Sequence, residues 1–97
     1  MYVVITTVQL RPGKIDEVRD LFEQTNPELV KDQTDWVEAK FTADRDEDQV
    51  TVLAFWLDAE SYKTFSASES FKQVMSQFGR YFAGPPQVTI NEILFEM

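Results

Sequence analysis

Few side chains in this sequence are suited to catalysis. The 97 residues include no His and no Cys, so the chain lacks the usual base near neutral pH, the usual zinc and haem ligands, and a thiol nucleophile. Chemistry must therefore use carboxylates, hydroxyls, amides, Arg or Lys, or the substrate itself. Nearly all carboxylates fall on faces predicted to be exposed, whereas acid–base catalysis by paired carboxylates requires that they be buried in a cleft.

Three polar side chains are candidates for a catalytic role: Asn26, Tyr62 and Trp36. The Asn26 amide could orient a quinol oxygen or dioxygen, and Tyr62, at the edge of an apolar stripe, could hydrogen-bond a phenolic substrate. Trp36 has charged neighbours that indicate a partly open face. Each also has a structural interpretation: a helix N-cap for Asn26 before Pro27, a core tyrosine for Tyr62, and a core or interface position for Trp36.

A second group of mostly apolar side chains is predicted to contact a substrate: Phe22, Trp56, Phe65, Phe71, Met75 and Arg80. The alternatives are that Trp56 packs in the core or a subunit interface, and that Arg80 only complements a helix dipole. The acidic run at residues 44–48 lacks the glycine and terminal Glu of a calcium loop, so it is predicted to be a solvated hairpin tip. We predict neither a metal nor a cofactor.

These candidates lie on elements that the sequence pattern outlines. Residues 2–10 are rich in β-branched side chains and end at Arg11-Pro12-Gly13, which predicts a strand and a turn. An amphipathic helix follows from Lys14. Pro27 removes a backbone donor, so we expect a kink there, with Asn26 capping a restarted turn.

Residues 35–43 and 49–57 predict a hairpin of two strands. Strict alternation in the first strand places Val37, Ala39, Phe41 and Ala43 on one side and Trp36, Glu38, Lys40 and Thr42 on the other. Asp58 and Ser68 are predicted to cap two successive helical segments. A last strand is expected over residues 87–95, after the Gly84-Pro85-Pro86 break.

The order βαββαβ predicts an α+β fold, a ferredoxin-like antiparallel sheet with helices on one face, as a single domain over residues 1–97. We expect the other face to carry Trp and Phe rather than charges. Exposed apolar surface costs about 25 cal/mol per Å², and a second copy is the economical way to cover it. The sequence therefore predicts a homodimer around an apolar cavity.

Charge and hydropathy limit the partners and the location. The net charge of −8 repels phosphate backbones and anionic lipids, so neither nucleic acid nor a membrane is an expected partner. The N-terminus carries no basic region, and no apolar run approaches the roughly 20 residues of a membrane span. We expect a cytoplasmic protein.

The whole chain resembles the antibiotic-biosynthesis monooxygenase-like domains of the dimeric α/β-barrel superfamily. The resemblance rests on four segments in order: Leu10-Arg11-Pro12-Gly13-Lys14, Phe55-Trp56-Leu57-Asp58, Glu60 to Phe65, and Ser68-Glu69-Ser70-Phe71. It implies paired four-stranded sheets between two subunits, with a pocket between sheet and helices in each. The haem-degrading branch is disfavoured, because Met75 and Phe65 stand near its axial His and its aromatic, and Thr6-Thr7 where an Asn is expected.

Two functions remain open from the sequence. By resemblance, the protein could oxygenate an electron-rich phenol or quinol without a cofactor, since the deprotonated substrate itself supplies the electron to dioxygen and the protein needs only a dry pocket with a few polar groups. The alternative is a non-catalytic binding or stress-related dimer whose interior is filled by side chains. An aromatic-lined cavity with an inward polar atom would favour the first.

Overall fold

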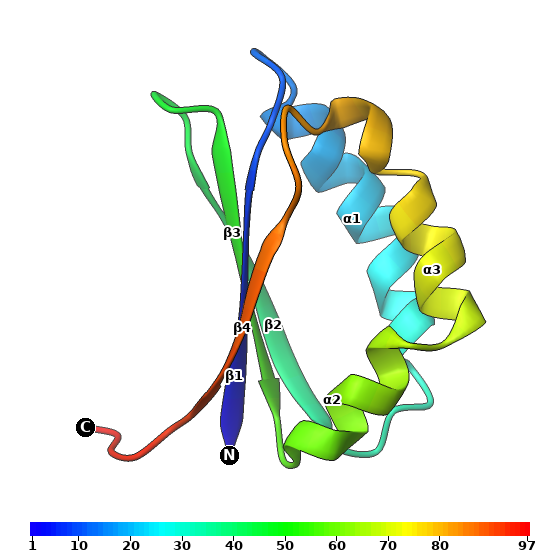
Figure 1. Ribbon diagram of the computed structural model, residues 1–97, viewed down its shortest axis with the longest axis vertical. Helices are drawn as coiled ribbons and strands as arrows, with labels where there is room; N and C mark the ends of the chain where they lie inside the picture. The colour runs from blue at the N-terminus through cyan, green and yellow to red at the C-terminus, as the bar shows by residue number, and fades with distance from the viewer.

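The computed structural model describes all residues, 1–97, as one antiparallel sheet covered by helices on one face (Figure 1). The elements in chain order are β1 (Tyr2–Gln9), α1 (Ile15–Val30), β2 (Trp36–Asp44), β3 (Gln49–Trp56), α2 (Ala59–Ser66), α3 (Glu69–Ser76), a 3-10 turn (Gly79–Tyr81) and β4 (Gln87–Glu92). The strand order is β2-β3-β1-β4 with all neighbours antiparallel. The predicted ferredoxin-like βαββαβ fold is therefore confirmed, with an open sheet.

The first helix differs from the prediction at Pro27. Helix α1 runs without interruption from Ile15 to Val30 and contains Pro27, so Asn26 is not an N-cap. The carbonyl that loses its donor belongs to Glu23, which is exposed, and water can satisfy an exposed carbonyl. The predicted restart at this position was wrong.

The two later helices follow the predicted segments, but only one has the predicted cap. Ser68 accepts a hydrogen bond from the amide of Phe71 at 3.2 Å, which confirms it as the N-cap of α3. Asp58 occupies the N-cap position of α2 but caps no amide. Its carboxylate instead accepts a bond from the Ser61 hydroxyl at 3.4 Å.

The hairpin tip between β2 and β3 is fastened to the turn after β1 by Asp48. Asp48 has a φ of 51°, a left-handed conformation that Asp tolerates better than most residues. Its carbonyl accepts from the amide of Leu10 at 2.8 Å, and its carboxylate accepts from the amide of Gly13 at 3.0 Å. The acidic tip is thus an anchored turn at the edge of the sheet.

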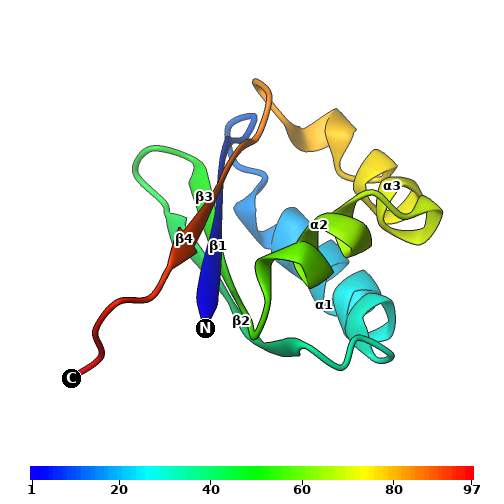
Figure 2. The ribbon, with the colours of Figure 1, turned by 60° about the horizontal axis from the view of Figure 1, so that its bottom comes forward.

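The fully buried core is small. Only nine of the 97 residues are buried, in two clusters around Val50 and Trp56. All six residues of the edge strand β4 are exposed, and the chain beyond it points away from the helices in both views (Figure 2). We call residues 93–97 the C-terminal tail; its Leu94 and Phe95 are 85% and 79% exposed. The last strand is shorter than the predicted 87–95.

Candidate functional site

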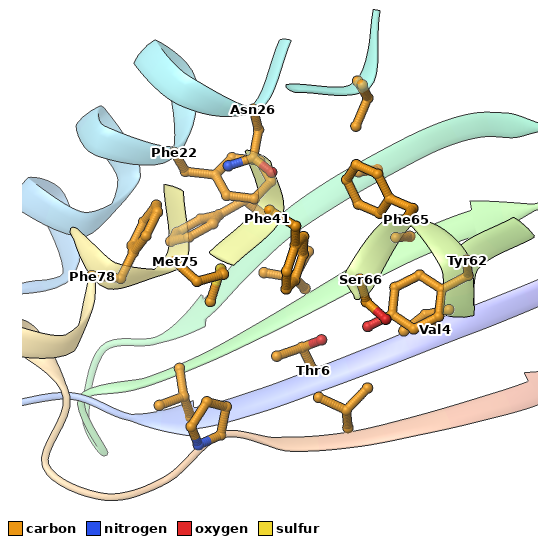
Figure 3. Close-up of a pocket in the computed structure, with 18 of the residues that line it drawn as sticks. Val4, Thr6, Phe22, Asn26, Phe41, Tyr62, Phe65, Ser66, Met75 and Phe78 are labelled. Atoms are coloured by element: carbon orange, nitrogen blue, oxygen red, sulfur yellow. The ribbon is translucent and has the colours of Figure 1, made fainter. Parts of the chain in front are cut away.

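A large apolar cavity lies between the sheet and the helices (Figure 3). Its volume is about 800 Å³, and 20 of its 26 lining residues are hydrophobic. This is within the range of pockets that enclose small organic ligands, which combine an apolar wall with a few placed polar groups. The sheet and helices therefore leave a half-open apolar space between them that is large enough for a small organic ligand.

Alternation along the strands decides which side chains reach this cavity. Val4, Thr6 and Val8 of β1 line it, as do Val50, Val52 and Ala54 of β3. Their alternating neighbours face the other side of the sheet. The alternation along β1 could therefore have predicted that Thr6 lines the cavity, because Thr6 lies between two buried valines on the same face. From the sequence, Thr6 was noted only as a departure from the haem-degrading pattern.

Aromatic rings form two walls of the cavity. Phe22 of α1 and Phe41 of β2 pack with ring centroids 5.2 Å apart. Trp56 at the end of β3 contacts Phe65 at 5.1 Å and Tyr62 at 5.7 Å, both from α2. Stacked and edge-on rings present flat apolar surfaces of the kind that accept an aromatic ligand.

Phe71 and Met75 of α3 extend the second wall. The Phe71 ring lies 5.2 Å from that of Phe65, and both α3 side chains line the cavity. Ser68 explains their direction, because its capping bond fixes where α3 starts and hence which face of the helix turns inward. Every aromatic or Met residue predicted to contact a substrate therefore borders this one cavity.

Trp36 reaches the cavity through a β-bulge. The pairing of β2 with β3 shifts register between Trp36 and Glu38, so that Trp36 lies opposite Trp56, and both tryptophans line the cavity. A bulge adds one residue to a strand and reverses the side on which earlier residues emerge. The prediction that Trp36 shares a face with Glu38 and Lys40 was wrong for this reason.

Asn26 lies on the inner face of α1, with its amide beside Phe22 at the cavity (Figure 3). The amide nitrogen donates to the Thr25 hydroxyl at 3.2 Å, and that hydroxyl donates to the carbonyl of Leu21 at 2.8 Å. The amide oxygen has no hydrogen-bond donor in the protein and remains available to a ligand.

The most unusual polar atom of the site is the indole nitrogen of Trp56. Trp56 is 1% exposed, and its Nε1 has no hydrogen-bond partner. A buried N–H without an acceptor costs about 1–3 kcal/mol, and such groups are rare in folded proteins.

Tyr62 and Ser66 place two hydroxyl groups on the α2 side of the cavity (Figure 3). Burial raises the pKa of the Tyr62 phenol, and a hydrogen bond with Ser66 partly opposes that rise. Tyr62 is therefore uncharged at neutral pH. Ser66 was not predicted as a site residue, although its spacing of four from Tyr62 places it on the same helical face.

Arg80 is the one predicted site residue that does not line this cavity. Its guanidinium donates to the Tyr81 hydroxyl at 2.9 Å and lies 4.8 Å from the centre of the Tyr81 ring. Among charged residues only Lys63 borders the cavity, and its ammonium group pairs with Glu60 at 3.3 Å. The cavity is thus uncharged apart from one paired lysine.

Comparison with known proteins identifies the family. The family model for antibiotic biosynthesis monooxygenases matches residues 1–77. The chain belongs to this family. No protein of curated function matches it significantly. No helix of the protein has the length and apolar character needed to cross a membrane.

Several solved structures share the fold at low sequence identity. A candidate antibiotic biosynthesis monooxygenase from Bordetella bronchiseptica superposes with a TM-score of 0.84 at 19% identity, over 97% of each chain. SnoaB, a cofactor-independent oxygenase from Streptomyces nogalater, superposes with a TM-score of 0.82 at 14% identity, over 99% of this chain and 95% of SnoaB. Rv0793 from Mycobacterium tuberculosis gives 0.79 at 16% identity, over 98% and 96%.

Proposed function

We propose that the protein binds a small aromatic phenol or quinol in this cavity and oxygenates it with dioxygen, without a cofactor. The observation that carries the proposal is the buried, unpaired Nε1 of Trp56 beside an aromatic-lined cavity of about 800 Å³. Membership of the monooxygenase family supports it, as does the similarity of fold to a cofactor-independent oxygenase.

In the proposed reaction the substrate loses a proton and becomes an electron-rich anion, which passes one electron to dioxygen. The two radicals combine to form a carbon–oxygen bond, the peroxide anion regains the proton given up in the first step, and the resulting hydroperoxide loses water to leave a carbonyl. In the keto tautomer of the substrate, such as anthrone, one CH₂ group and one O₂ thus give one C=O and one H₂O. The protein binds and orients the substrate and excludes water from it.

Each polar group of the cavity has a proposed part in that reaction. The Trp56 N–H donates to the substrate oxygen and stabilises the negative charge that develops there. The Tyr62 oxygen contacts the same substrate hydroxyl, while Asn26 and Trp36 orient the far side of the ring system or dioxygen. Phe22, Phe65, Phe71 and Met75 form the apolar walls. Arg80 remains a predicted contact that a single subunit does not bring to the cavity.

The test is oxygen consumption by the purified protein with anthrone or a naphthalene quinol and no added cofactor. We expect one O₂ per carbonyl formed. Trp56→Phe keeps a ring but removes the donor and should lower kcat/KM about a hundredfold, whereas Tyr2→Phe, outside the cavity lining, should not change it. Absence of turnover across the panel would contradict the proposal.

A non-catalytic binding protein is the second candidate. The observation that favours it is that the cavity holds no ionised base, since its one charged lining residue, Lys63, is paired with Glu60. Substrate binding without oxygen uptake, measured on the same panel, would select this function.

We also propose that the functional unit is a homodimer with the uncovered sheet faces packed together. Val3 pairs with Phe55 and Ile5 with Leu53 on that face, so four partly buried apolar side chains form a compact group that we call the open-face cluster. The C-terminal tail extends toward the same side of the sheet (Figures 1 and 2). A facing copy would cover both apolar surfaces.

Two further expectations belong to this proposal. Residues 1–97 form one domain, and the protein acts in the cytoplasm. Limited proteolysis should release no stable fragment smaller than the chain, and cell fractionation should recover the protein with cytoplasmic markers.

A further inference from the structure

The polar groups of the cavity are unevenly distributed along it. The lining residues that belong to the core cluster around Val50, or pack against it, carry no nitrogen or oxygen atom in their side chains. They are Val8, Val18, Phe22, Phe41, Val50, Val52, Met75, Phe78 and Phe82. We call this part of the cavity the apolar end.

The hydroxyl groups of Tyr62 and Ser66 lie at the other end. Both residues line the cavity, and Figure 3 shows their oxygens on the side away from Phe78 and Met75. Tyr62 packs against the second core cluster, which contains Trp56. We call this part of the cavity the polar end.

Thr6 marks the boundary between the two ends on the sheet. It lies on β1 between Val4, which belongs to the cluster around Trp56, and Val8, which belongs to the cluster around Val50. All three side chains line the cavity. The wall formed by β1 therefore changes from one cluster to the other at its only polar side chain.

Asn26 marks the same boundary on α1. Val18, Phe22, Asn26 and Val30 all line the cavity and form one row along the helix, because positions four apart share a face. Val30 packs against the cluster around Trp56, whereas Phe22 and Val18 belong to the apolar end. At about 1.5 Å per residue, the row continues for about 12 Å beyond Asn26 without another polar group.

This distribution restricts which part of a ligand each end accepts. An oxygen atom of a ligand at the apolar end would find no side-chain donor or acceptor, and a buried polar group without a partner is unfavourable. The shape of the apolar end also matters. Phe22 and Phe41 contact each other at a tilt of 48° and leave no parallel slot for a flat ring, while the flexible Met75 adapts to irregular shapes.

We infer that the ligand has two parts: a phenol or quinol ring at the polar end, and an alkyl or prenyl chain without polar groups at the apolar end. The inference rests on the proposed ligand site and narrows its substrate class from phenols and quinols in general to those with a hydrocarbon chain. Thr6 and Asn26 lie where the ring ends and the chain begins.

Four probes test this inference: 2-naphthol, 6-butyl-2-naphthol, 6-(3-hydroxypropyl)-2-naphthol and 2-anthrol. The hydroxypropyl chain has as many non-hydrogen atoms as the butyl chain but ends in a hydroxyl, and 2-anthrol has as many carbons as the butyl probe but a third ring in place of the chain. Dissociation constants are measured under argon to prevent oxidation.

We expect the butyl probe to bind about 50-fold more tightly than 2-naphthol. Each buried methylene contributes about fourfold, and ordering the chain removes part of that gain. The hydroxypropyl probe should bind about tenfold or more weakly than the butyl probe, because its terminal hydroxyl is buried without a partner. 2-Anthrol should also bind more weakly than the butyl probe.

The position of the chain can be measured directly on the native protein. Of the three methionines, only Met75 lines the cavity, so its methyl group reports on the apolar end. We expect NMR cross-relaxation between this methyl group and the butyl protons, but not between it and the 2-naphthol ring protons. Met75→Leu assigns the signal.

A variant that fills the apolar end supplies a second test. Val52 lies opposite Thr6 on the neighbouring strand and is only partly buried, so the larger ring of Val52→Phe projects into the start of the apolar end. The advantage of the butyl probe over 2-naphthol should fall to about fivefold or less. The matched control is Val37→Phe, because Val37 is 40% exposed and lies outside the cavity lining.

The outcomes distinguish this inference from the proposed function. If 2-naphthol binds but the butyl chain adds no affinity, or shows no contact with the Met75 methyl group, the inference is overturned and the ligand site stands. Equal or tighter binding of 2-anthrol would assign the apolar end to a third ring and overturn the chain. The Met75 measurement decides the matter even if Val52→Phe does not fold. If no probe binds at millimolar concentration, the proposed ligand site itself is overturned.

Discussion

The two faces of the sheet are built from the same strands but have different chemistry. The face under the helices carries Val4, Val50 and Trp56, which are at most 2% exposed, and it borders a cavity. The other face carries the open-face cluster, flanked by polar residues such as Glu38 opposite Phe55 and Asn91 opposite Val3. An apolar centre with a polar rim is typical of a protein interface, whereas an apolar wall with isolated donors is typical of a ligand pocket.

The strongest test of this difference is a charge placed in the open-face cluster. Leu53→Asp should convert the proposed dimer to monomers, because an unpaired carboxylate would be buried between two subunits, at a cost of about 3–5 kcal/mol. Sedimentation equilibrium at micromolar concentration measures the change. Gln73→Asp on an exposed helix surface is the control, and a native protein that sediments as a monomer would contradict the proposed interface.

On the covered face, the largest effect should be on folding. Trp56→Ala removes a large ring that is 1% exposed and should lower the free energy of unfolding by about 3–5 kcal/mol. Trp36→Ala, at its partly buried partner position, should cost less. Urea denaturation followed by circular dichroism compares the two, and equal losses would show that burial does not distinguish these positions.

Shortening the C-terminal tail should weaken association without changing the cavity. A chain ending at Ile93 loses Leu94 and Phe95, which a single subunit leaves exposed. We expect the dimer dissociation constant to rise about tenfold or more, as for loss of one interface anchor, with probe binding unchanged. The reverse pattern, normal association with altered ligand binding, would place the tail at the cavity instead.

The smallest effect concerns alkaline pH on the covered face. Burial raises the pKa of Tyr62 above its ordinary value of about 10, so the folded state holds this proton more tightly than the unfolded state. Stability from this group is therefore complete below pH 10 and is lost as pH rises through the folded pKa. A tyrosinate absorbance titration should show one late-titrating tyrosine, which Tyr62→Phe removes.

The sequence predicted the fold well because its signals are local. Alternation, the Arg11-Pro12-Gly13 turn and the Ser68 cap each act within a few residues, and all agree with the structure. The predictions failed where a single residue altered the structure that a sequence pattern normally produces. The bulge after Trp36 reversed a side-chain direction, and Pro27 lies inside a helix that was expected to restart there.

The side chains on the two faces of the sheet were also predicted only in part. The uncovered face was expected to carry Trp and Phe, yet both tryptophans face the cavity and only Phe55 belongs to the open-face cluster, beside the charged Glu38 and Lys40. A sequence that is apolar on both faces of a strand, as β3 is, does not say which face the helices cover. The unpaired Trp56 nitrogen likewise depends on contacts between elements that are distant in the sequence.

The nine-residue core has a consequence for how this protein behaves at different concentrations. If association covers the open face, folding and assembly are one equilibrium, and mass action then makes the melting temperature rise with total protein. A dilute sample would unfold at lower temperature than a concentrated one. Cellular abundance would thus set how much of the chain is folded, and with it the number of ligand sites that exist.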